Sequence, residues 1–73
     1  MTEDRMIEEG LEVSTHALIQ SINGLTRKEQ RLRQEGLDEQ AVCVRHTIDT
    51  LYRIRDELFA LLHEQKRNRT RNR

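Results

Sequence analysis

Three histidines and a single cysteine are the side chains of this chain that are best suited to catalysis or metal binding. His16, His46 and His63 fall at outward-facing positions of a heptad pattern, and none has the Glu-x-x-His spacing that builds carboxylate-bridged metal sites in helical bundles. His46, with Asp49 one turn later, could accept a phosphoryl group, although ordinary surface histidines fit the same pattern. Cys43 is expected to be an exposed thiol, either idle or available for an interchain disulfide. The sequence therefore predicts no catalytic residue, no metal site and no cofactor.

A polar stripe and a basic C-terminus are the second group of residues that could have a chemical role. The stripe is free of acidic residues on its own line of the expected first helix, so it could lie against an RNA backbone, and the arginine-rich end could add phosphate contacts. Amphipathic helices also carry such stripes without binding RNA, a basic end complements the helix dipole, and the net charge is zero. The candidate RNA-binding residues are His16, Gln20, Asn23, Arg27, Arg31, Gln34, Lys66, Arg67, Arg69, Arg71 and Arg73.

These side chains are positioned by two long helices, which the spacing of apolar residues predicts. Leucines recur every seven residues at 11, 18, 25 and 32, so a helix is expected at about 3 to 35. Gly36 is suited to end this helix and Asp38 to N-cap the next one, which places a tight turn at 36 to 38. A second helix is expected at about 39 to 66, followed by a basic flexible tail at 67 to 73. Its seam is formed by Ala41, Val44, Ile48, Leu51, Leu58 and Leu62, interrupted by Arg55.

The two seams agree with each other as an antiparallel hairpin. In such a hairpin, the numbers of facing residues add to a constant, which is 73 here. Asn23-Gly24 is the main objection, because this dipeptide favours a turn, and Thr26 with Glu29 matches a capping box that could begin a third helix. The leucine heptad crosses this point without a change of phase, so one continuous helix is the favoured interpretation. The predicted layers are Leu32 with Ala41, Glu29 with Val44, Leu25 with Ile48, Ile22 with Leu51, Leu18 with Arg55, Thr15 with Leu58, and Leu11 with Leu62.

Apolar residues beyond the seam predict that another chain covers part of the hairpin. Burying a large apolar side chain contributes roughly 1.5–3 kcal/mol, so a chain this short is not expected to leave several exposed. The covering chain is either a second copy, which would complete a four-helix bundle, or a helix or groove of another protein. Arg55 occupies a seam position, where it either extends to solvent or forms an ion pair that fixes the register. The predicted interface comprises Ile19, Leu51, Tyr52, Ile54, Arg55, Leu58, Phe59, Leu61 and Leu62, with Ile7 as a further apolar neighbour.

The composition restricts the class of protein. Charged residues make up 36% of the chain and aromatic residues 3%, and proline is absent, which is typical of long solvated helices rather than of an enzyme-sized globule. The longest apolar run, residues 59 to 62, is far shorter than the ~20 residues that a membrane span requires. A single cysteine and the lack of a signal-peptide pattern favour a reducing cytoplasm. We therefore expect a cytoplasmic protein with no membrane and no small-molecule substrate.

Two short segments resemble the Rop (repressor of primer) family of plasmid RNA regulators. They are residues 37 to 41 with Cys43, and Leu51-Tyr52-Arg53. They lie within an overlap of about 16 residues, and the spacing between them differs from the family by a few residues. The resemblance implies a helical hairpin that dimerises into a four-helix bundle and binds paired RNA loops through its first helices. The matching residues belong to the turn and the bundle, and the first helix does not reproduce the family's contact residues. The resemblance thus supports the architecture more than the RNA activity.

The length and heptads are also similar to those of small helical-hairpin chaperones of type III secretion, which hold a needle subunit together with a larger partner. The leading hypothesis is accordingly an all-α, coiled-coil-like hairpin that acts as a bacterial or phage regulator or adaptor through protein–protein contact. The alternative is a Rop-like RNA-binding regulator. An enzyme has no feature of the sequence in its favour.

Overall fold

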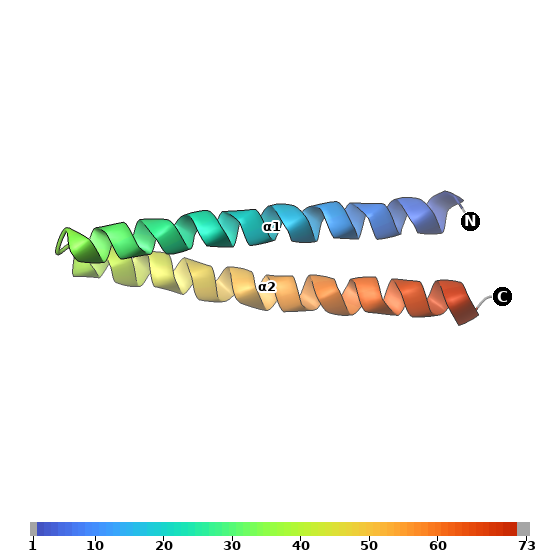
Figure 1. Ribbon diagram of the computed structural model, residues 1–73. Coiled ribbons are helices and arrows are strands. Elements are labelled where there is room, and N and C mark those ends of the chain that lie inside the picture. Colours follow the sequence, from blue (N-terminus) through green and yellow to red (C-terminus); the bar gives the residue numbers. More distant parts are fainter. Residues whose placement is uncertain (1, 72–73) are drawn as a thin grey trace.

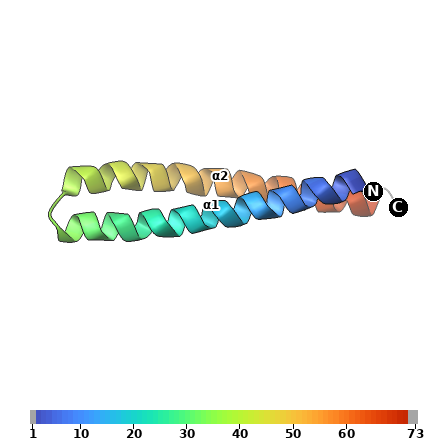
Figure 2. The same ribbon diagram turned by 90° about the horizontal axis from the view of Figure 1, so that it is seen from above.

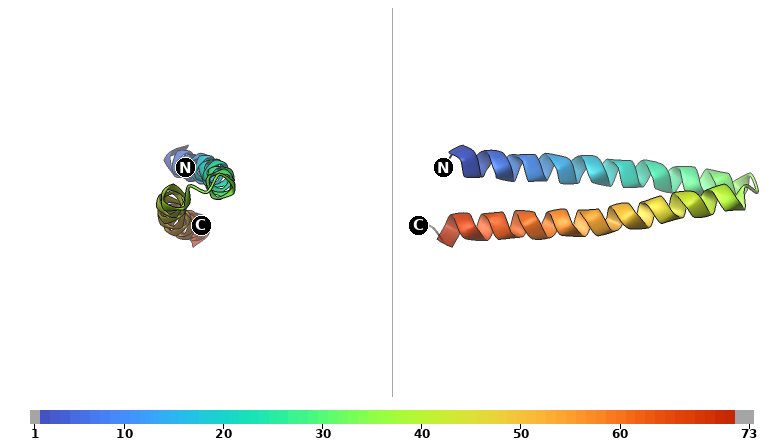
Figure 3. Two further views of the ribbon diagram at one scale, coloured as in Figure 1. Left: turned by 90° about the vertical axis from the view of Figure 1, so that its left-hand side faces the viewer. Right: turned by 180° about the vertical axis from the view of Figure 1, so that it is seen from behind.

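The chain folds into two antiparallel helices joined by a short turn. The computed structural model describes the backbone of residues 2–71 and the side chains of residues 3–68. Helix α1 spans Thr2–Gln34 and helix α2 spans Asp38–Arg71. Figure 1 shows the two helices side by side along their whole length, with both termini at one end, and the end-on view in Figure 3 shows them as a single pair. The two helices are in contact with each other. This confirms the predicted all-α hairpin.

The turn is built around Gly36, as predicted. Its backbone has a φ of 77°, a left-handed conformation that glycine adopts without steric cost. The amide of Gly36 donates to the carbonyl of Arg33, and the amide of Leu37 donates to that of Leu32, which together form a Schellman C-cap. The carbonyl of Leu37 then accepts a hydrogen bond from the amide of Ala41. Helix α2 therefore begins at Asp38, one residue earlier than predicted, and Leu37 rather than Asp38 occupies the N-cap position.

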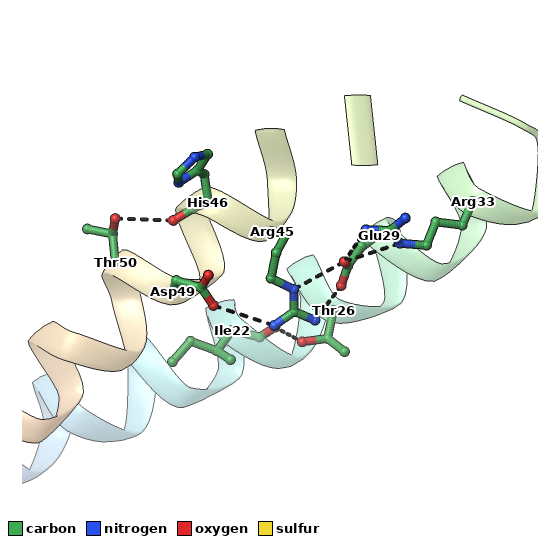
Figure 4. A network of polar contacts seen from close by, with 8 residues as sticks. All are labelled: Ile22, Thr26, Glu29, Arg33, Arg45, His46, Asp49 and Thr50. Atoms are coloured by element: carbon green, nitrogen blue, oxygen red, sulfur yellow. Dashed lines mark hydrogen bonds and ion pairs between the residues drawn. The ribbon is translucent and has the colours of Figure 1, made fainter. Parts of the chain in front are cut away.

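Helix α1 passes through Asn23-Gly24 without a break. The hydroxyl of Thr26 does not cap a new helix but donates to the carbonyl of Ile22 (2.8 Å), as Figure 4 shows. The other capping-box residue, Glu29, is engaged by arginines instead. The continuous-helix interpretation is therefore correct and the three-helix alternative is wrong.

The seam between the helices consists of two interleaved sets of positions. The inner set comprises Thr15, Ile22 and Glu29 on α1 with Ala41 and Ile48 on α2, and each of these residues is at most 5% exposed. The leucine set is only half-buried; it comprises leucines 11, 18 and 25 on α1 with leucines 51 and 58 on α2. The two helices are thus rotated against each other so that the inner set points into the contact and the leucine set is partly open to solvent.

The predicted register is confirmed. Every residue of the predicted seam is buried or half-buried. Polar contacts between the helices include Asp4 with Gln65, Glu12 with Lys66, and Glu29 with Arg45. Their residue numbers add to 69, 78 and 74, values that straddle the expected 73. Figures 1 and 2 together show the helices winding around each other, as a seven-residue repeat on a 3.6-residue helix requires.

Helix α2 is longer than predicted. It continues to Arg71, so residues 67 to 71 extend the helix instead of forming a flexible tail, while residues 72 and 73 lie outside the described residues. Arginine and lysine have high helix propensity, and contacts of Gln65 and Lys66 with α1 anchor the preceding turn. The described part of the chain contains no helix with an apolar stretch that could span a membrane.

Candidate functional site

The seam has two edges, and each carries a different group of apolar residues. One edge is formed by the residues that directly follow the heptad line of the leucine set on each helix. Glu12 on α1 and Lys66 on α2 are two of these residues, and their ion pair (3.6 Å) shows that the two rows lie on the same edge. Positions one residue before the inner set, among them 7, 54 and 61, lie on the opposite edge. We call the first edge the aromatic flank, formed by Ile19, Tyr52 and Phe59; the guanidinium of the seam residue Arg55 lies against both rings. We call the second the aliphatic flank, formed by Ile7, Ile54, Leu61 and the leucine set.

Arg55 lies beside the aromatic flank, against the rings of Tyr52 and Phe59. Its guanidinium lies 4.8 Å from the ring centre of Tyr52 and 5.8 Å from that of Phe59, and it pairs with Asp56 on the same helix (3.0 Å). The aliphatic stem leaves the seam, and the charge stays at the surface with its side chain 32% exposed. Within the hairpin, Arg55 therefore extends to solvent, as the snorkelling interpretation expects; an ion pair at an interface with another chain stays a prediction.

Glu29 forms a polar network with two arginines on the same edge of the seam, near the turn. Its carboxylate accepts hydrogen bonds from Arg45 on α2 (2.6 and 3.1 Å) and from Arg33 one turn along α1 (3.2 Å), as Figure 4 shows. The hydrogen bonds from Arg45 lower the pKa of Glu29; desolvation opposes this shift, and Arg33 adds to it. Asp49 in turn contacts Arg45 at 3.6 Å. A buried carboxylate is therefore fully satisfied by charge-assisted hydrogen bonds.

The sequence analysis missed Arg45 in this network. The register rule assigned Val44 as the residue that faces Glu29, and Val44 is indeed half-buried. Arginine is long enough to reach a carboxylate from the neighbouring position on the helix. An acidic residue in an apolar seam, with an arginine four residues later and another near the facing position, was the signal that could have revealed the network.

The aliphatic flank carries large apolar side chains that the hairpin leaves exposed. Ile7, Ile54 and Leu61 are 45%, 40% and 52% exposed, and the half-buried leucine set lies directly beside them. Covering the exposed part of each of the three would contribute roughly 1 kcal/mol, about half of the value for complete burial. Apolar residues of both helices therefore form a continuous surface along this side of the hairpin.

The predicted interface residues do not form one surface. Ile54, Leu61, Leu51 and Leu58 belong to the aliphatic flank, whereas Ile19, Tyr52 and Phe59 lie on the aromatic flank, where Tyr52 and Phe59 are exposed and Ile19 is half-buried. Leu62 and Arg55 lie at seam positions between the two flanks and are half-buried. A flat partner that covers one flank would leave the other in solvent, so the predicted interface divides into two candidates.

The predicted RNA-binding residues of α1 are all at the surface. The side chains of His16 and Gln20 are hydrogen-bonded to each other (3.2 Å). Arg27 and Arg31 are exposed and form no ion pair within residues 3–68. The stripe also includes Asn23 and Gln34, both exposed. At the C-terminus, Lys66 is paired with Glu12 and Arg67 is exposed, whereas Arg73 and the side chains of Arg69 and Arg71 lie outside the described part.

The residues considered for catalysis or metal binding remain apart. His16, His46 and His63 are exposed, and Cys43 is an exposed free thiol near the turn. Among the described residues, no three histidine, cysteine, aspartate or glutamate side chains are grouped so that they could hold a metal ion.

Comparison of the sequence with protein-family models and curated proteins, and of the fold with solved structures, found no match.

Proposed function

We propose that this protein is a small non-enzymatic regulator or adaptor that acts by helix–helix contact with a second protein chain. The observation that carries the proposal is the aliphatic flank, where Ile7, Ile54 and Leu61 continue a half-buried row of leucines along both helices. Contiguous exposed apolar surface is typical of protein interaction sites. The single cysteine is compatible with action in a reducing cytoplasm.

The test is an interaction measurement with two matched variants. Ile54→Gln and Val13→Gln make the same chemical change at exposed positions, but Val13 lies on the outer side of α1, away from both flanks. Affinity purification from the native host, followed by binding measurements with each variant, should show that Ile54→Gln weakens binding by roughly fivefold and that Val13→Gln has no effect. A folded chain that stays monomeric by light scattering and recovers no protein partner would disprove the proposal.

RNA binding is a second candidate function. It is favoured by Arg27 and Arg31, two exposed guanidinium groups on α1 that form no ion pair among the described residues. Such groups can contact phosphates, and the basic C-terminus would add to the attraction. Retention of structured RNA should then decrease steeply with salt. Charge reversal at both arginines, combined with removal of the basic C-terminus, should abolish retention; unchanged RNA affinity in that variant would exclude this function.

A further inference from the structure

We propose that the aliphatic flank binds a single amphipathic helix of a different protein, in which lysine or arginine residues border the apolar stripe. The helix lies on the half of the flank nearest the two termini, which we call the open half (Figure 1). This inference rests on the proposed function, because it names the chemistry of the partner for the same surface. The hairpin and the bound helix together form a three-helix bundle.

The leucine set forms level pairs along the flank. The hydrogen bond between Asp4 and Gln65 (3.2 Å) joins two positions on the heptad line of this set, and their residue numbers add to 69. Successive positions on the line are seven residues, or about 10 Å, apart, which is the repeat of an apolar stripe on a heptad helix. A third helix can therefore place an apolar side chain against every pair. The same sum of 69 pairs Leu11 with Leu58 and Leu18 with Leu51.

Small residues on the α1 side of the open half leave room for the partner. They follow Ile7 at steps of three and four residues, which places them on one face of the helix, and they are exposed: Gly10, Ser14, Ala17 and Ser21. At Gly10 an added Cβ would meet nothing within 4 Å. The α2 side carries the larger Ile54 and Leu61. Because the distance between packed helices depends on the side chains at the contact, the partner helix lies closest to α1.

Carboxylates border the apolar residues of the open half. Glu57 lies one turn from both Ile54 and Leu61, and Glu64 lies one turn beyond Leu61. Both carboxylates are exposed, and neither forms an ion pair within residues 3–68. On α1, the exposed Glu3 lies one turn before the apolar edge begins. Basic residues of a partner can therefore pair with these carboxylates.

The charge of the open half selects the class of partner. Among the residues one turn before or after Ile7, Ile54 and Leu61, four are acidic and none is basic. A second copy of this chain that docked by the same half would place acidic residues against acidic residues, and nucleic acid would be repelled for the same reason. A helix with lysine or arginine beside its apolar stripe is complementary to this surface.

The size of the open half suits one helix. The hairpin measures 57 × 15 × 11 Å along its principal axes, so half of its broad face covers roughly 430 Å². A helix of about 18 residues, which is about 27 Å long, spans this half. The area is that of a transient complex, so we expect a dissociation constant on the order of 1–100 μM.

Two synthetic peptides test the chemistry of the partner. Each is a helix of about 21 residues with leucine at the a and d positions of its heptads; one carries lysine at positions e and g, and the other carries glutamate there. Binding is measured by fluorescence anisotropy, at concentrations where sedimentation shows the free peptides to be monomeric. The lysine peptide should bind about tenfold more tightly, and the difference should shrink as salt is raised. Equal affinities, a preference for glutamate, or no binding of either peptide would overturn the inference.

A bulky side chain tests where the lysine peptide binds. Ser14→Trp occupies the space beside α1 and should weaken binding by roughly tenfold. His16→Trp adds the same ring two residues later, on the other side of the helix, and should leave binding unchanged. Circular dichroism shows that both variants are folded. Equal effects of the two substitutions would overturn the assigned site.

Charge reversal tests the acidic border. Glu57→Lys combined with Glu64→Lys should weaken binding of the lysine peptide by roughly tenfold. Glu9→Lys combined with Glu39→Lys is the matched control, because it makes the same change of net charge at exposed positions outside the flank. It should change the affinity by less than about twofold. An equal loss in both double variants would overturn the role of the border.

The partner recovered from the native host separates this inference from the proposed function. A partner that contacts Ile54 through an acidic helix or a strand would overturn the inference and support the proposed function. Sedimentation that shows the flank covered by a second copy of the chain would do the same. If neither peptide binds and the host yields no protein partner, both are wrong.

Discussion

Two glycine-to-alanine substitutions should change the stability of the hairpin in opposite directions, although the chemical change is the same. At Gly24 and at Gly36 an added Cβ would meet nothing within 4 Å, so steric overlap does not distinguish the two sites. Gly24 lies in the middle of α1, where alanine is favoured over glycine by about 0.8–1 kcal/mol. Gly24→Ala should therefore raise the free energy of unfolding by about 1 kcal/mol, which corresponds to about 4–8 °C in Tm for a domain of this size.

Gly36→Ala should destabilise the hairpin, because its φ of 77° is strained for an L-residue. The left-handed conformation costs a residue with a Cβ about 1–2 kcal/mol, and the lower entropy of the unfolded chain returns about 0.4–1 kcal/mol. The net loss is about 1 kcal/mol. Urea unfolding followed by circular dichroism measures both variants, in dilute protein because self-association would add its own stabilisation. Changes of the same sign would refute the reasoning, since only the backbone conformation differs between the sites.

Two further predictions concern the inner set. Ile48→Ala should lower the free energy of unfolding by roughly 2–5 kcal/mol, whereas Val42→Ala on the exposed surface of α2 should change it by less than about 0.5 kcal/mol; urea titration of both variants is the measurement. The folded-state pKa of Glu29 is lowered, so its contribution is fully present above the usual glutamate pKa of about 4.3 and is lost as the pH falls through the folded-state pKa. Urea unfolding below pH 5 should show this acid-dependent part in the native chain and not in Glu29→Gln.

The hairpin was predictable from the sequence because its two signals are strong and independent. The leucine heptad on one helix and the apolar seam on the other share one register, and Gly36 marks the turn between them. The extension of α2 to Arg71 was missed because the apolar seam ends at Leu62, while the helix continues on propensity and on the contacts of Gln65 and Lys66. Heptad patterns report the buried part of a helix and not its full length.

The division of the candidate interface was not predictable from hydrophobicity. Both sets of seam positions look equivalent as a heptad, and which set points inward depends on how the helices rotate against each other when they pack. The structure turns Thr15 and Glu29 inward and leaves the leucines half open, so Tyr52 and Ile54, only two residues apart in the sequence, lie on opposite edges. Such a rotation is a property of the packed pair and not of either helix alone.

The inner set contains polar residues, whereas the leucine set beside it is only half-buried. Thr15 satisfies its hydroxyl by donating to the carbonyl of Leu11 (2.7 Å), and Glu29 depends on Arg45 and Arg33, so two of the best-covered positions hold polar side chains. A hairpin that functioned alone would gain more by placing leucine at the covered positions and polar residues at the open ones. The observed order is the reverse. This order supports the proposal that a second chain docks on the aliphatic flank, where it would bury the leucine set.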